Sequence, residues 1–75
     1  MDGVSMIQIS DSSLASEIGY DPTEQYLYIR FKNTGKVFRY RDFGPADWES
    51  FKNASSIGKF YHAHIRGVFT GEQVE

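Results

Sequence analysis

Tyrosines and basic residues are interleaved along one stretch of the chain, and together they can bind single-stranded nucleic acid. Five of the eight lysines and arginines fall between residues 25 and 41, which contain no acid, so this stretch has a local charge of +5. Flat aromatic rings can stack on unpaired bases, and cations between them can hold the phosphates. The candidate residues for binding nucleic acid or a partner are Tyr26, Tyr28, Arg30, Lys32, Arg39 and Arg41.

The same residues admit two other interpretations. Tyrosine and arginine dominate the hot spots of protein interfaces, so this face can bind another protein. A lattice of these side chains across neighbouring strands can also serve only to stabilise the sheet. The rest of the chain has ten acids and three bases, and an acidic surface of this kind repels nucleic acid. The sequence leaves the three interpretations open.

A second candidate site lies at the start of the second predicted helix. Free backbone N–H groups at a helix start can bind a phosphate, and a nearby lysine would add a positive charge. Ordinary helix capping explains the same residues equally well. The candidate anion site consists of Ser55, Ser56, Gly58 and Lys59.

Patterns typical of catalysis or of metal binding do not occur in the sequence. It has no cysteine, which excludes a disulfide framework and a thiolate metal site. His62 and His64 are two residues apart on a predicted helix and point in different directions, so they cannot easily share a metal. No nucleophile-elbow, phosphate-loop or dinucleotide fingerprint occurs. We predict a protein that is not an enzyme and that uses no cofactor and no metal.

The basic stretch is predicted to form a β-hairpin. Residues 25–31 and 36–41 alternate in polarity, which indicates two strands with one buried face each. The turn between them, residues 32–35, ends in a glycine that tolerates a positive φ. Residues 14–20 alternate as well and are expected to be the first strand of a three-stranded antiparallel meander. Residues 6–9 can add a short fourth strand at the N-terminal edge.

Two helices are expected after this sheet. Pro45 suits the first turn of a helix that ends near Asn53, and Ser55 or Ser56 can cap the second helix. Apolar residues in the second helix recur at i, i+3, i+4, i+7 and i+8, which indicates one buried face. The predicted fold is α+β, with a three-stranded antiparallel meander covered on one face by two C-terminal helices. The face with the tyrosines and arginines would then be open to solvent.

The predicted core joins the apolar face of the sheet to the apolar faces of the helices. In the first strand, strict alternation places Leu14 and Ser16 on the core face. Phe38 and Tyr40 are expected to pack in the core rather than to bind a ligand. The predicted core residues are Leu14, Ile18, Tyr20, Leu27, Ile29, Phe31, Phe38, Tyr40, Trp48, Phe51, Ile57, Phe60, Tyr61 and Ile65.

Seventy-five residues are enough for one small domain. We expect a single domain over residues 1–75, with residues 1–11 as an N-terminal extension and residues 70–75 as a flexible tail. The apolar runs are far shorter than a membrane span, and the first residues do not resemble a signal peptide. We therefore expect a cytoplasmic protein without membrane contact.

Several short blocks of the sequence follow one another as they do in a known family. The blocks are Ser12-Ser13, Ile18-Gly19-Tyr20-Asp21-Pro22, Leu27-x-Ile29-x-Phe31, Phe38-Arg39-Tyr40, Ala54-Ser55-Ser56-x-Gly58-Lys59-Phe60 and Ile65-Arg66-Gly67. With these blocks the chain resembles the KTSC domain, which is named for its occurrence at the C terminus of some lysyl-tRNA synthetases. The family also includes small single-domain proteins of bacteria and phages. The resemblance covers roughly residues 12–69.

The chain departs from the family pattern at two places. The family has a central Tyr-x-Tyr, which here is Phe38-Arg39-Tyr40, so one hydroxyl is missing. Phe43-Gly44-Pro45 stands where the family usually has a single valine before the proline. The resemblance implies RNA binding by analogy with the synthetase attachment, and it implies no catalytic residues.

The sequence as a whole predicts a small binding module. The first hypothesis is that its tyrosine and arginine face binds RNA or another single-stranded nucleic acid, so that Arg39→Ala and Tyr28→Ala both weaken binding. The alternative is a module that binds a bacterial protein, such as a phage-type modulator that docks on a host enzyme.

Overall fold

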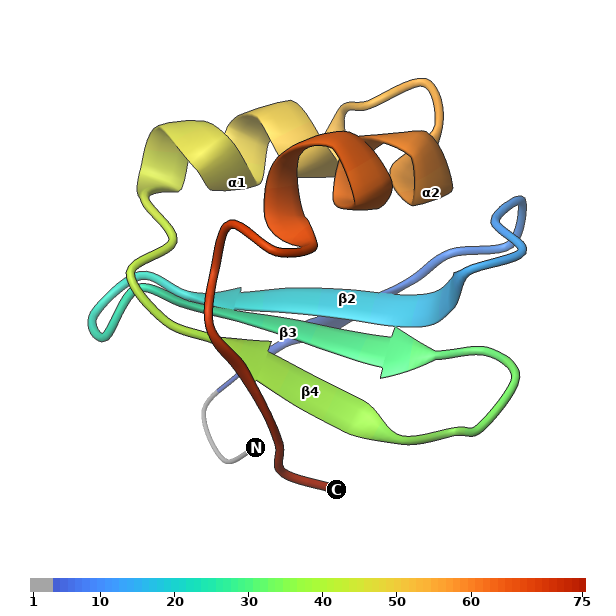
Figure 1. Ribbon diagram of the computed structural model, residues 1–75, viewed down its shortest axis with the longest axis horizontal. Coiled ribbons are helices and arrows are strands. Elements are labelled where there is room, and N and C mark those ends of the chain that lie inside the picture. Colours follow the sequence, from blue (N-terminus) through green and yellow to red (C-terminus); the bar gives the residue numbers. More distant parts are fainter. Residues whose placement is uncertain (1–3) are drawn as a thin grey trace.

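The computed structural model describes residues 4–75 as a five-stranded antiparallel sheet with two helices on one face (Figure 1). The strands are adjacent in chain order, β1-β2-β3-β4-β5. This arrangement confirms the predicted α+β class and the short N-terminal edge strand. The elements are β1 (Met6–Gln8), β2 (Ala15–Asp21), β3 (Tyr26–Phe31), β4 (Val37–Tyr40), α1 (Pro45–Lys52), α2 (Ile57–Phe60), the π-helical turn η1 (Tyr61–Ile65) and β5 (Gly71–Gln73).

The central hairpin forms as its alternation predicts. Leu27 pairs with Tyr40 and Ile29 with Phe38, so the apolar side chains of β3 and β4 share the face under the helices. Gly35 closes the turn with φ +73, and its N–H donates to the Phe31 carbonyl over 2.8 Å. A residue with a Cβ would be strained at this φ, which explains the glycine.

A β-bulge in β2 changes which residues of that strand face the core. The pairing with β3 shifts between Ala15 and Glu17, so Ser16 is the extra residue. Ala15 is fully buried as a result, whereas Leu14 is only partly buried. The predicted core positions of Leu14 and Ser16 are therefore wrong, because strict alternation contains no sign of an inserted residue.

The core under the helices contains the other predicted residues, either buried or packed against the buried cluster. The sequence-based list omits Phe43, which is 1 % exposed. Its ring lies 5.0 Å from that of Phe69 and 6.4 Å from that of Phe51, measured between centroids. Phe43 therefore joins the loop after β4 to α1 and to the segment that follows η1.

Residues 71–73 form an edge strand, and the residues on either side of it also bond to β4 and to the residue after it, so this segment is not the flexible tail over residues 70–75 that the sequence predicts. In β5, Gly71 pairs with Tyr40 and Glu72 with Arg39. The Val74 N–H donates to the Val37 carbonyl over 2.8 Å, and the Val37 N–H donates to the Glu75 carbonyl over 3.0 Å. These bonds satisfy backbone groups on the outer edge of β4. The segment lacks apolar alternation, and for this reason the sequence does not predict a strand there.

Side chains cap the N-termini of both helices, and Ser56 confirms the cap predicted for the second. The Asp47 carboxylate accepts a hydrogen bond from the Gly44 N–H over 3.2 Å, and Ser56 Oγ accepts one from the Lys59 N–H over 3.2 Å. Gly67, at φ +77, follows the last helical turn, as expected for a helix C-terminus. Within residues 4–75, no helix has the length and the apolar character that crossing a membrane requires.

Candidate functional site

The predicted binding residues of β3 and β4 lie on the face of the sheet opposite the helices. Tyr28 is opposite Arg39, and Arg30 is opposite Val37. The neighbouring strands extend the first pair into a row, with Gly19 on one side and Glu72 on the other. The sheet therefore brings the tyrosines and arginines of both strands together, as the sequence predicts.

This face is less open than the sequence predicts. Tyr28 is 6 % exposed and Val37 is fully buried. Gly19 stands beside Tyr28 on β2 and has no side chain, so the segment around β1 can occupy the space above it. A Cβ added at Gly19 would lie 3.1 Å from a methyl of Val4 and 2.5 Å from Sδ of Met6. The segment around β1 thus packs closely on this face. Tyr28 is a packing residue here, and its ring offers little surface to a ligand.

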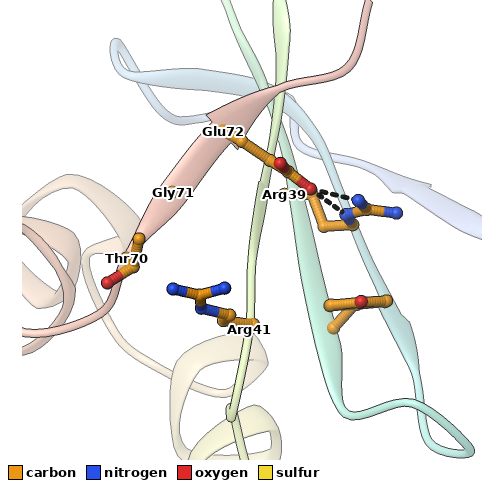
Figure 2. Close-up of a pocket in the computed structure, with 6 residues that line it drawn as sticks. Arg39, Arg41, Thr70, Gly71 and Glu72 are labelled. Carbon is orange, nitrogen blue, oxygen red and sulfur yellow. Dashed lines mark hydrogen bonds and ion pairs between the residues drawn. The ribbon is translucent and has the colours of Figure 1, made fainter.

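Arg39 is occupied by a carboxylate and an aromatic ring. Its guanidinium forms an ion pair with Glu72, in which the Arg39 Nε to Glu72 Oε1 distance is 2.9 Å (Figure 2). The guanidinium carbon lies 4.3 Å from the centre of the Tyr26 ring. The hydrogen bond to Glu72, followed by hydrogen bonding to Tyr28, raises the pKa of Arg39 above its usual value.

Arg30 is held by two carboxylates. Its Nε donates to Glu17 Oε1 and its Nη2 to Glu75 Oε1, each over 2.8 Å. A third bond, of 2.7 Å, runs from Nη1 to the Gly35 carbonyl. These carboxylates, Glu75 first, raise the pKa of Arg30. Three glutamates therefore offset the charges of Arg30 and Arg39, and the local charge on this face is smaller than the sequence of the hairpin indicates.

Arg41 stands apart from these ion pairs. It is exposed, and in the described part of the chain it takes part in none of the salt bridges. Figure 2 shows its guanidinium on the other side of β4 from the pair of Arg39 and Glu72. Lys32 is exposed as well, and its Nζ donates to the Ser12 carbonyl over 3.2 Å. Arg41 is thus the cation of the predicted set that is most available to a ligand.

A cavity of about 200 Å³ lies where β3, β4 and β5 meet (Figure 2). We call this cavity and its lining the Arg41 corner. It combines one exposed cation, one aromatic ring and one ion pair. The lining residues are Tyr26, Arg39, Arg41, Thr70, Gly71 and Glu72.

The predicted anion site at the start of α2 is a polar hollow of about 150 Å³. Ser55, Ser56 and Gly58 line it, and Lys59 lines the neighbouring hollows. Ser56 Oγ is already engaged as the helix cap, and Asp11 also lines the hollow. A carboxylate there would repel an anion, so the geometry favours the capping interpretation. Among residues 4–75 no group of three or more His, Asp or Glu side chains could hold a metal ion.

The aromatic pair of β4 packs toward the helices. Tyr40 is 5 % exposed, and its hydroxyl lies 3.0 Å from the hydroxyl of Tyr61. Phe38 packs edge-to-face on Phe31 at 5.6 Å between ring centres. The prediction that Phe38 and Tyr40 are packing residues is confirmed. Burial, and then the hydrogen bond to Tyr61, raises the pKa of Tyr40 above its ordinary value of 10.0.

This shift predicts a loss of stability at alkaline pH. A tyrosine whose pKa is raised by folding stabilises the protein fully below pH 10, and this contribution is lost as the pH rises through the folded-state value. Tyr40→Phe should lower the free energy of unfolding by about 0.5–1.5 kcal/mol at pH 7, because one buried hydrogen bond is lost. The variant should then lose less stability than the wild type between pH 9.5 and about 11. Urea unfolding at several pH values measures both effects. If the free energy of unfolding fell equally with pH in the variant and in the wild type, the raised pKa of Tyr40 would be contradicted.

Comparison with known proteins places this architecture in a family. The family model for the KTSC domain matches residues 11–69, which contain β2, β3, β4 and both helices. The chain belongs to the KTSC domain family. The matched residues leave out β1 and β5.

Relatives show the KTSC domain in two settings. A protein of Tsukamurella paurometabola is 32 % identical over 63 residues, which are 84 % of this chain and 92 % of the relative. A lysine–tRNA ligase of Nostoc sp. is 31 % identical over 64 residues, which are 85 % of this chain and 11 % of the ligase. The crystal structure of a KTSC domain protein from Yersinia pestis superposes with a TM-score of 0.90 at 29 % identity, and the match covers 97 % of this chain and 100 % of the other.

In the part of the chain that the structure describes, five residues of the candidate site escape the sequence-based prediction. Glu17, Glu72 and Glu75 neutralise Arg30 and Arg39, and Thr70 and Gly71 line the Arg41 corner. The cross-strand register could have indicated Glu17, which stands opposite Arg30. No signal in the sequence places Glu72 and Glu75 beside β4, because their strand is not predicted.

Proposed function

We propose that this KTSC domain is a non-enzymatic module that binds single-stranded RNA at the Arg41 corner. The observation that carries the proposal is that the exposed Arg41 and the aromatic ring of Tyr26 line the same cavity of about 200 Å³. A cation can hold a phosphate, and an aromatic ring or a stacked guanidinium gives a base a flat surface. Arg39, which already lies over Tyr26, supplies such a surface.

The setting of a relative supports the same proposal. The lysine–tRNA ligase of Nostoc sp. contains a segment similar to most of this chain, and a ligase of that name acts on a tRNA. A small domain attached to such an enzyme is well placed to contact RNA. This support is an analogy between relatives and adds no residue to the site.

A protein-binding module is the second candidate, and the charge balance of the face favours it. Glu17, Glu72 and Glu75 lie among the arginines, so a long polyanion would meet repulsion along most of the sheet. Protein interfaces tolerate such mixed charge, and they favour tyrosine and arginine at their centres. The RNA proposal is therefore limited to the Arg41 corner and does not extend over the whole face.

Arg41→Ala tests the RNA proposal. Binding of a fluorescent single-stranded RNA is expected with a dissociation constant on the order of 10–100 μM at low salt. Loss of one phosphate contact should weaken binding about fivefold and should reduce the slope of log K against log salt concentration by about 0.7. Fluorescence anisotropy at several salt concentrations measures both quantities.

The matched control is Arg66→Ala, which removes an exposed arginine after η1, on the helical side of the molecule. It changes the net charge equally, so it should lower the affinity much less than Arg41→Ala. Equal losses in the two variants would show that only the overall charge matters, and wild-type protein that leaves the anisotropy unchanged would remove the RNA proposal.

A further inference from the structure

The outer edge of β4 already holds an extended acidic strand, which is the chain's own β5. Figure 1 shows the C-terminal segment running beside β4. The backbone of Val37 donates to the Glu75 carbonyl and accepts from the Val74 and Glu75 N–H groups. At the other end, the Arg41 N–H donates to the Thr70 carbonyl over 3.4 Å. The edge thus offers a ladder of donors and acceptors that only a peptide backbone can match.

Two carboxylates fix the register of this strand by charge. Glu72 is directly opposite Arg39 and forms its ion pair, and Glu75 reaches Arg30 on the next strand. Two residues separate the two acids in sequence, and at this spacing each carboxylate reaches one of the two guanidinium groups. An extended segment with acids at other positions would satisfy one arginine at most.

Glycine is required at a third position of the strand. Gly71 pairs with Tyr40, and a Cβ on Gly71 would lie 2.5 Å from Cε2 of the Tyr40 ring and 2.9 Å from Cδ2. That ring cannot easily move, because it is 5 % exposed and its hydroxyl contacts Tyr61. The β4 edge therefore selects a strand with glycine opposite Tyr40.

β5 itself is weakly held. It is three residues long, all of them are exposed, and it lies outside the region that the KTSC family model matches. A short strand without buried side chains opens at little cost in free energy. Its tether still keeps it at an effective concentration in the millimolar range, so it covers the edge until a better-fitting segment replaces it.

We propose that the outer edge of β4 is a docking site for an extended acidic segment of a partner protein, of the pattern Gly-Glu-x-x-Glu, and that β5 occupies this site when the partner is absent. The glycine lies over Tyr40, the first glutamate binds Arg39 and the second binds Arg30. The backbone ladder favours a peptide over nucleic acid, whose phosphates could reach the arginines but could not pair with β4. This inference does not depend on RNA binding at the Arg41 corner.

The test uses the full chain with Gly71→Ala, which should push β5 away from Tyr40 and accelerate hydrogen exchange at the Val37 and Arg41 amides. The probe is a synthetic peptide with the sequence of residues 69–75, followed by amide chemical shifts of the ¹⁵N-labelled protein. Resonances of residues 37–41 should shift when the peptide is added to Gly71→Ala. This variant should bind the peptide about tenfold or more tightly than the wild type does, because β5 competes for the site in the wild type. A peptide with both glutamates replaced by glutamine should bind about fivefold more weakly, and one with alanine for glycine should cause no shift.

Glu72→Gln with Glu75→Gln is the second opened variant, because it weakens β5 without touching Tyr40. The same peptide titration is carried out on this double variant if Gly71→Ala disturbs the core or leaves β5 in place. The proposal is overturned if the peptide binds neither variant, or if the glutamine peptide binds as tightly as the acidic one. Shifts at residues 37 and 38, away from the Arg41 corner, that arise with a single-stranded RNA but not with the peptide would assign the edge to nucleic acid. A wild-type dimer that Gly71→Ala converts to a monomer would assign it to strand exchange between two copies.

Discussion

Replacing Phe43 with alanine is expected to lower the free energy of unfolding by about 3–5 kcal/mol. The side chain is 1 % exposed and touches rings from three other parts of the fold, namely Tyr20, Phe51 and Phe69. Its backbone is fixed as well, because its carbonyl accepts from the Tyr20 hydroxyl over 2.6 Å. A cavity at this junction cannot collapse without moving α1 or the segment before β5.

A loss of this size is large for so small a domain. Globular proteins are stabilised by roughly 0.05–0.15 kcal/mol per residue, so Phe43→Ala should leave the domain close to its unfolding threshold at 37 °C. Urea unfolding followed by circular dichroism measures the change. Phe43→Leu is the control, and it should cost less than about 1.5 kcal/mol because it keeps most of the volume. A loss below 1 kcal/mol for Phe43→Ala would show that this junction is not packed as described.

Tyr28→Ala is expected to destabilise the domain by about 2–4 kcal/mol, although this tyrosine lies on the face opposite the helices. The side chain is 6 % exposed and packs edge-to-face on Tyr26, with 6.3 Å between ring centres. Its removal would leave a gap between Gly19 and Arg39, the residues that stand beside it on β2 and β4. Thermal unfolding and urea unfolding both report this loss.

Tyr26→Ala is the matched control for this prediction. Tyr26 is the neighbouring tyrosine on the same face but is only partly buried, so its removal should cost clearly less stability. For RNA binding we expect the reverse order. Tyr26→Ala should weaken RNA binding more than Tyr28→Ala does, since Tyr26 lines the Arg41 corner and Tyr28 does not. If Tyr28→Ala weakened RNA binding without affecting stability, Tyr28 would be part of an open stacking platform, as the sequence alone predicts.

The parts of the fold with strong periodicity could be predicted from the sequence. Period-two alternation gave the hairpin of β3 and β4, and the i, i+3, i+4 spacing gave the buried face that begins at Ile57. The bulge at Ser16 and the burial of Phe43 could not be predicted in this way. The first breaks the alternation without a change in composition, and the second depends on a loop residue that packs between distant segments.

The candidate site was predictable in its residue types and in its face, but not in its electrostatics. Alternation placed Tyr26, Arg30 and Arg39 on one face, and the structure confirms this. The sequence contains no sign that Glu72 and Glu75 pair with these arginines, because the contacts join residues 33 and 45 positions apart through an unpredicted edge strand. Charge counted along a hairpin thus overstates the charge on the folded surface.

Mapping of RNA contacts by NMR tests the proposed function most directly. A short mixed-sequence single-stranded RNA is added to the ¹⁵N-labelled wild-type chain at low salt, and amide shifts are followed residue by residue. We predict that the shifts concentrate at Tyr26, at residues 39–41 and at residues 70–72, and that Arg41→Ala makes them clearly smaller at the same RNA concentration, because it weakens binding about fivefold. Shifts centred on α2 and η1, or none at concentrations well above 100 μM, would contradict RNA binding at the Arg41 corner.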